Sequence, residues 1–139
     1  DPLSVIPSGL SLVTGVLDKK FNFWSLDEHI RKRFIDRLYR ALVELLKRFH
    51  DDWTNNNIDK EKVFIVRFDT MMSDFETLMG GILNFINVEK NESLIKVIQE
   101  TADSQRHYKS GHKYNLDKFG LTEEQIRSDC KDIYQTFLS

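Results

Sequence analysis

The clearest pattern of apolar and polar positions lies between residues 63 and 88. Residues 63–66, VFIV, form a short apolar run without alternation, which is typical of a strand buried on both faces of a parallel sheet. Residues 73–76, SDFE, fit the capping box that starts a helix. Apolar residues then recur at helical spacing, at Phe75, Leu78, Met79, Ile82, Leu83 and Ile86. The pattern predicts one strand near residues 62–68, a short turn and an amphipathic helix.

The predicted strand has no second strand of comparable quality to pair with. A buried parallel strand without neighbours cannot satisfy its backbone N–H and C=O groups. We therefore expect the chain to be part of something larger. Its beginning with Asp1 and Pro2, rather than Met, indicates in addition that upstream residues have been removed or left out.

Helical patterns cover most of the remaining chain. Pro7 suits a first helical turn, and Ser8 in that turn is either an ordinary helix-start residue or a hydroxyl that helps free N–H groups to hold an anion. The longest helix is predicted from about Leu26 to Trp53 by its apolar stripe. Asn91 is the expected cap of a short helix, and residues 121–125, LTEEQ, form a second capping box before a final helix.

The long helix also carries many cations away from its apolar stripe. They are either a basic patch for an anionic partner or, as such residues more often are, a solvated helix face with acids interspersed. These cations are Arg31, Lys32, Arg33, Arg37, Arg40, Lys47 and Arg48.

Composition narrows the possible classes of protein and of binding partner. The 139 residues suffice for one domain, and a hydrophobic content of 40% allows a core. A net charge of −2 gives no indication of a nucleic acid or membrane partner. No apolar run approaches the roughly 20 residues of a membrane span. The single cysteine, Cys130, lies in an apolar stripe and is interpreted as a small buried hydrophobe.

The most chemically suggestive stretch is polar and runs from residue 101 to residue 114. Its cations surround a Ser-Gly pair, where guanidinium and ammonium groups supply charge and glycine lets the backbone approach an anion. An exposed basic loop without a ligand is the alternative. The residues concerned are Arg106, His107, Lys109, Ser110, Gly111, His112 and Lys113.

The usual catalytic and metal-binding motifs are missing from the sequence. The four histidines form no HExxH pattern, and neither a Gly-rich phosphate loop nor a GxSxG elbow is present. We therefore assign no catalytic residue and no metal ligand within this chain.

Three stretches resemble the C-terminal half of sulfotransferases that use 3′-phosphoadenylyl sulfate (PAPS). Residues 63–88 are similar to the family's strand–helix pattern. Residues 106–126, RHYKSGHKYNLDKFGLTEEQI, resemble its basic loop and closing helix and are the most specific match. Asp1, Pro2 and Ser8 fit the family's 3′-phosphate motif if an Arg precedes Asp1.

The resemblance implies an α/β, P-loop-kinase-like domain, of which residues 1–139 are the C-terminal portion: mostly helical, with one buried parallel strand near residues 62–68. It implies transfer of a sulfuryl group from PAPS to an acceptor hydroxyl or amine, leaving adenosine 3′,5′-bisphosphate (PAP). The acceptor is a small molecule, lipid or carbohydrate. The family's 5′-phosphosulfate loop, catalytic lysine and general base lie upstream, in a missing N-terminal half.

The resemblance also implies a cofactor site within this chain. Ser8 would bind the 3′-phosphate, and the loop residues would close over the phosphates. Those loop residues are Arg106, Lys109, Ser110, Gly111, His112 and Lys113. Family members occur in the cytoplasm, which is the expected compartment here, and also in the secretory pathway.

A non-enzymatic alternative remains open. In it the chain is a helical interaction module that docks through its long helix and lends its strand to a partner's sheet edge. This alternative needs no missing half.

Overall fold

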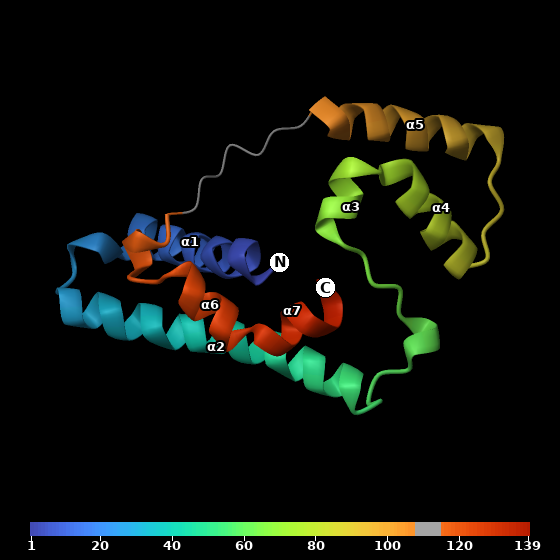
Figure 1. The fold of residues 1–139 in the computed structure, drawn as a ribbon. Coiled ribbons are helices and arrows are strands. Elements are labelled where there is room, and N and C mark those ends of the chain that lie inside the picture. Colours follow the sequence, from blue (N-terminus) through green and yellow to red (C-terminus); the bar gives the residue numbers. More distant parts are fainter. Residues whose placement is uncertain (108–114) are drawn as a thin grey trace. The chain divides into compact units, whose positions relative to one another are not determined.

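The computed structural model describes residues 1–107 and 115–139, and within these ranges every regular element is helical (Figure 1). The elements in chain order are α1 (Pro2–Phe21), η1 (Phe23–Ser25), α2 (Glu28–Thr54), η2 (Lys60–Lys62), α3 (Phe68–Ser73), α4 (Phe75–Phe85), α5 (Glu92–His107), η3 (Asp117–Phe119), α6 (Glu123–Asp129) and α7 (Lys131–Phe137). The described residues form two compact units. The first unit comprises residues 1–57 and 115–139, and the second unit comprises residues 58–107.

The predicted α/β fold is wrong for the described chain, because the expected strand at 62–68 is not one. Val63 (φ −126°, ψ 119°) and Arg67 (φ −87°, ψ 131°) do have extended backbone. No strand lies beside them within the described ranges, however, and the segment between η2 and α3 has no regular structure. A strand is defined by its pairing, so an apolar run without a neighbouring strand stays extended but unpaired.

The first unit is held together by one core to which both ends of the chain contribute. Apolar faces of α1 and α2 pack against each other, and α6 and α7 cover them (Figure 1). The buried residues of this core are Ile6, Leu10, Phe23, Ile35, Tyr39, Val43, Phe119, Leu121, Ile126, Cys130 and Ile133. Cys130 is fully buried, as its apolar stripe predicts.

Two tyrosine hydroxyls are among the polar groups that tie the C-terminal helices to the rest of this unit. The Tyr39 hydroxyl on α2 donates a hydrogen bond to Asp129 Oδ2 at 2.6 Å. The Tyr134 hydroxyl on α7 donates to Asp1 Oδ1 at 2.7 Å. Segments about 90 and 130 positions apart in sequence are thereby fixed in register.

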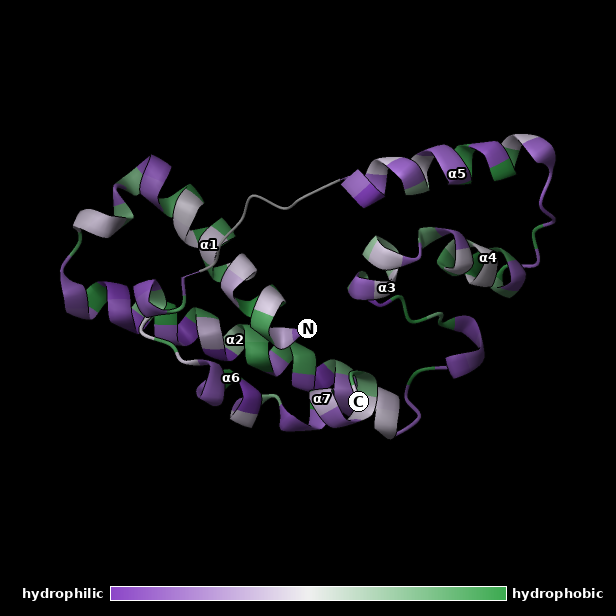
Figure 2. Ribbon diagram, turned by 45° about the horizontal axis from the view of Figure 1, so that its top comes forward, coloured by the Kyte–Doolittle hydropathy of each residue, from purple (hydrophilic) through white to green (hydrophobic). Residues whose placement is uncertain are grey.

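The long helix is confirmed, because α2 runs from Glu28 to Thr54. Hydrophobic and hydrophilic residues alternate along its ribbon, as expected of an amphipathic helix (Figure 2). The Thr122 cap is also confirmed, since its hydroxyl accepts from the Gln125 N–H at 3.2 Å. The predicted final helix is divided into α6 and α7 at Cys130.

Two predicted helix starts need correction. The first helix begins at Pro2 and not near Pro7, because the Asp1 carboxylate accepts from the Leu3 N–H at 2.9 Å and so caps the helix earlier. Before α4, the capping side chain is that of Asp74, which accepts from the Thr77 N–H, and Ser73 instead ends α3.

Alkaline pH should test the contact between Tyr39 and Asp129. Burial, and then the hydrogen bond to Asp129, raise the pKa of Tyr39 above its ordinary value. The folded state therefore resists an ionisation that the unfolded chain undergoes above about pH 10. The resulting stability is complete below that pH and is lost as pH rises toward the folded-state pKa.

Tyr39→Phe should lower the free energy of unfolding at pH 7 by about 1 kcal/mol, because one hydrogen bond is lost. The gap between wild type and variant should then narrow as pH rises above about 10. Urea denaturation of both proteins at several pH values measures the gap. A gap that stays constant through this range would contradict the burial and bonding of this hydroxyl.

Candidate functional site

The structure describes two of the seven residues predicted to bind the cofactor. Ser8 lies on α1 in the first unit, and Arg106 lies on α5 in the second unit. The other five, Lys109, Ser110, Gly111, His112 and Lys113, lie outside the described residues.

Ser8 does not lie where an anion would meet free N–H groups. Because α1 begins at Pro2, the N–H groups of its start belong to the first turn, where they bond to Asp1, and Ser8 is half-buried in the second turn. The start of the helix is instead occupied by the Asp1 carboxylate, which accepts from the Leu3 N–H and from the Tyr134 hydroxyl. A carboxylate at this position repels a phosphate, so the predicted cluster of hydroxyl and free N–H groups is not formed around Ser8.

Arg106 lies in the last turn of α5, where a cation suits the helix dipole. Its guanidinium donates to the Asp103 carboxylate one turn earlier, and this bond raises the pKa of Arg106. One ring nitrogen of the neighbouring His107 lies 2.7 Å from the Asp103 carbonyl oxygen. Both partners of the Arg106–Asp103 pair are exposed, so the pair contributes little stability and an anion can compete for the guanidinium.

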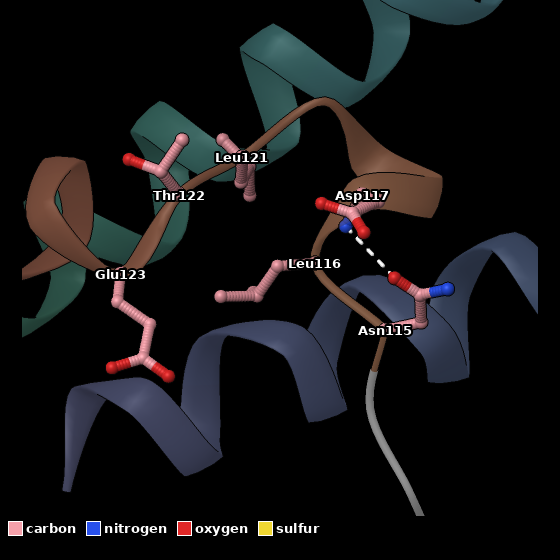
Figure 3. Close-up of a pocket in the computed structure, with 6 residues that line it drawn as sticks. All are labelled: Asn115, Leu116, Asp117, Leu121, Thr122 and Glu123. Atoms are coloured by element: carbon pink, nitrogen blue, oxygen red, sulfur yellow. Dashed lines mark hydrogen bonds between the residues drawn. The ribbon is translucent and has the colours of Figure 1, made fainter.

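A pocket of about 440 Å³ lies in the C-terminal part of residues 106–126 (Figure 3). It is lined by Asn115, Leu116, Asp117, Leu121, Thr122 and Glu123. The Asn115 side-chain oxygen accepts from the Asp117 N–H at 2.9 Å, which orders the start of η3. The charged lining residues are both carboxylates. The pocket therefore disfavours the phosphates of PAPS, and no motif of the sequence predicted it.

The turn beside this pocket is firmly anchored. Phe119 and Leu121 are buried, and the Leu121 N–H donates to the Leu116 carbonyl oxygen at 3.2 Å. Gly120 between them has φ 65°, a left-handed conformation that glycine adopts readily. Lys118 Nζ lies 4.3 Å from the centre of the Trp24 ring. The Phe-Gly-Leu-Thr sequence thus fixes residues 115–122 to the core of the first unit.

The aromatic loop before α2 takes part in the same anchoring. Phe23 is buried and packs edge-on against Trp24 and Phe34, whereas Phe21 is exposed. Phe23 is therefore an anchor in the core of the first unit.

No protein-family model, curated protein or solved structure matches this chain. Among the described helices none is long and apolar enough to cross a membrane. The same residues contain no group of three or more His, Cys, Asp or Glu side chains able to hold a metal ion.

Two glycines provide a matched test of the anchored turn. Neither Gly120 nor Gly15 on α1 has an atom within 4 Å of an added Cβ, so substitution changes backbone preference alone. Gly120→Ala should lower the free energy of unfolding by about 1–2 kcal/mol, because alanine is strained at positive φ. Gly15→Ala should raise it by about 0.5–1 kcal/mol, because alanine favours a helix. Equal effects in denaturant unfolding would contradict the left-handed turn.

Proposed function

We propose that this chain carries part of the cofactor site of a PAPS-dependent sulfotransferase. The observation that carries the proposal is residues 106–126, whose basic loop and Phe-Gly-Leu-Thr turn resemble those of the family. The anchored turn at Gly120 supports it, because a loop that closes over a ligand needs a rigid attachment to deliver its charges reproducibly.

In the proposed reaction an acceptor hydroxyl or amine attacks the sulfur of PAPS. The bond between sulfur and the bridging phosphate oxygen breaks, PAP leaves, and the acceptor proton passes to a general base. Negative charge grows on the bridging and sulfuryl oxygens, so cations aimed there lower the barrier. The base, the 5′-phosphosulfate loop and the lysine beside it belong to the proposed upstream half of the same domain.

The residues of this chain would act on the phosphates. Lys109, His112 and Lys113 supply positive charge, while Ser110 and Gly111 allow close backbone approach. Arg106 can join them by exchanging Asp103 for a phosphate, since the existing pair is solvent-exposed. Ser8 would contribute its hydroxyl alone, because the first-turn N–H groups of α1 lie one turn earlier and bond to Asp1.

A second candidate function is a non-enzymatic interaction module, and one observation favours it. Phe64, Ile65 and Val66 are 37%, 39% and 44% exposed in an extended segment of the second unit (Figure 2 colours it hydrophobic). Within the described part of the chain, no backbone hydrogen bond of these three residues is found. Such a segment can pair with the sheet edge of another protein. In the sulfotransferase proposal the covering surface belongs to the upstream half instead.

Binding of PAP to the complete protein tests the first proposal. PAP well above micromolar concentration should raise the melting temperature, because it binds the folded state. Lys109→Ala and His112→Ala should each weaken PAP binding by about 1–3 kcal/mol if they make charged hydrogen bonds to phosphate. Isothermal titration calorimetry measures both losses.

Lys96→Ala is the matched control, since Lys96 is an exposed cation on α5 whose nearest carboxylate is Glu100 at 3.9 Å. Its PAP affinity should equal that of the wild type. Absence of any thermal shift with PAP would reject cofactor binding. Wild-type PAP affinity in both loop variants would show that the loop is a basic segment that does not bind the cofactor.

Denaturation of the 139-residue chain alone separates the two candidates. An interaction module should be monodisperse and unfold in one cooperative transition. A part of a larger domain should instead aggregate or unfold gradually, because the second unit exposes so much apolar surface. Circular dichroism against urea, with light scattering, reports the outcome; a single sharp transition without a PAP response would favour the module.

A further inference from the structure

Four residues on α2 form a straight basic row on the side of the helix opposite the core. The row consists of His29, Arg33, Arg37 and Arg40, which are all exposed. They recur at four- and three-residue spacing, so they share one face and extend over about 16 Å at 1.5 Å per residue. They also line a surface pocket of about 330 Å³, together with Lys32 and Asp36.

The three arginines of this basic row are not neutralised by neighbouring acids. Lys32 pairs with Asp36 at 2.9 Å, and this pair occupies the one carboxylate that lines the pocket. Across the described ranges, no ion pair of Arg33, Arg37 or Arg40 is found. Glu44, one turn beyond Arg40, ends the row. A short line of uncompensated guanidinium groups remains, although the chain as a whole has a net charge of −2.

The structure around the basic row narrows the possible partner. A membrane is disfavoured because the apolar face of α2, with Ile35, Tyr39 and Val43, is buried in the core and cannot insert into lipid. Single-stranded nucleic acid is disfavoured because, among the residues that line the pocket, His29 carries the one aromatic ring on which a base could stack. Duplex nucleic acid is disfavoured because the row offers three arginines along about 16 Å, which is few phosphate contacts for a duplex.

We propose that the basic row of α2 binds an acidic polysaccharide that carries sulfate groups. Guanidinium forks match the oxygens of sulfate and carboxylate in paired hydrogen bonds, which favours arginine over lysine at such a site. Groups spaced along a flexible chain can meet cations that are placed one helical turn apart. This site does not rest on the proposed sulfotransferase activity, because none of its residues belongs to the proposed cofactor site.

Heparin, a sulfated polysaccharide, is the probe for the complete protein, with affinity measured by fluorescence anisotropy at several salt concentrations. The variant Arg33→Gln, Arg37→Gln, Arg40→Gln should bind at least about tenfold more weakly than wild type. The control Lys19→Gln, Lys20→Gln, Lys131→Gln removes the same charge from exposed positions off the row and should lose less than about twofold. Far-UV circular dichroism verifies that both variants keep their helices.

Three results would overturn this inference. Wild type without measurable heparin affinity at low salt would show that the row binds no such chain. Equal losses in the two variants would show an effect of bulk charge alone. Tighter, arginine-dependent binding to duplex DNA or to anionic lipid vesicles would assign the row to that partner instead. PAP affinity is measured in a separate experiment. A failure of the cofactor proposal would therefore not change the meaning of these three heparin results.

Discussion

Burial of α6 and α7 against α1 and α2 is the interaction on which the first unit depends. Ile6 and Leu10 near one end of the chain, and Ile126 and Cys130 near the other, are completely excluded from solvent. Because such contacts are distant in sequence, they close a large chain loop, and the entropy of that closure must be offset by apolar burial. Tyr39 and Tyr134 make this packing specific, since each hydroxyl donates a hydrogen bond to one particular carboxylate.

The second unit has no comparable core. Leu78, Leu83, Ile98 and Ala102 are buried, but many large apolar side chains there are exposed. The exposed ones are Phe64, Ile65, Val66, Phe68, Phe85, Ile86, Val88, Ile95 and Val97. Apolar surface on this scale marks an interaction site. Both candidate functions require such a site, and they differ in whether the covering surface belongs to the same domain or to another protein.

The sequence predicts the features that depend on near neighbours. The apolar stripe of α2 and the Thr122 cap are read correctly because each involves residues a few positions apart. The strand predicted at 62–68 is wrong for a physical reason. Its β-branched residues favour extended backbone locally, but a strand also needs a partner strand, which no local pattern supplies. At α1, Pro2 and Pro7 both suit a first turn, and the Asp1 cap decides for the earlier start. The carboxylate-lined pocket arises from the η3 turn, and the composition of residues 115–120 does not reveal the geometry of that turn.

The charges of the first unit distinguish the two proposed anion sites, the cofactor site and the basic row on α2. Carboxylates lie at two places in this unit that could have received a phosphate: Asp1 at the start of α1, and Asp117 and Glu123 in the pocket. In the proposed cofactor site, a phosphate must draw its cations from Arg106, from residues 109–113 and from the proposed upstream half, because a nearby carboxylate raises the free energy of the phosphate. The basic row of α2 lies on an exposed face without such opposition beyond Asp36, which Lys32 already pairs. The proposed cofactor binding thus depends on cations from the loop and from the proposed upstream half. The basic row, in contrast, presents its cations on one helix, α2.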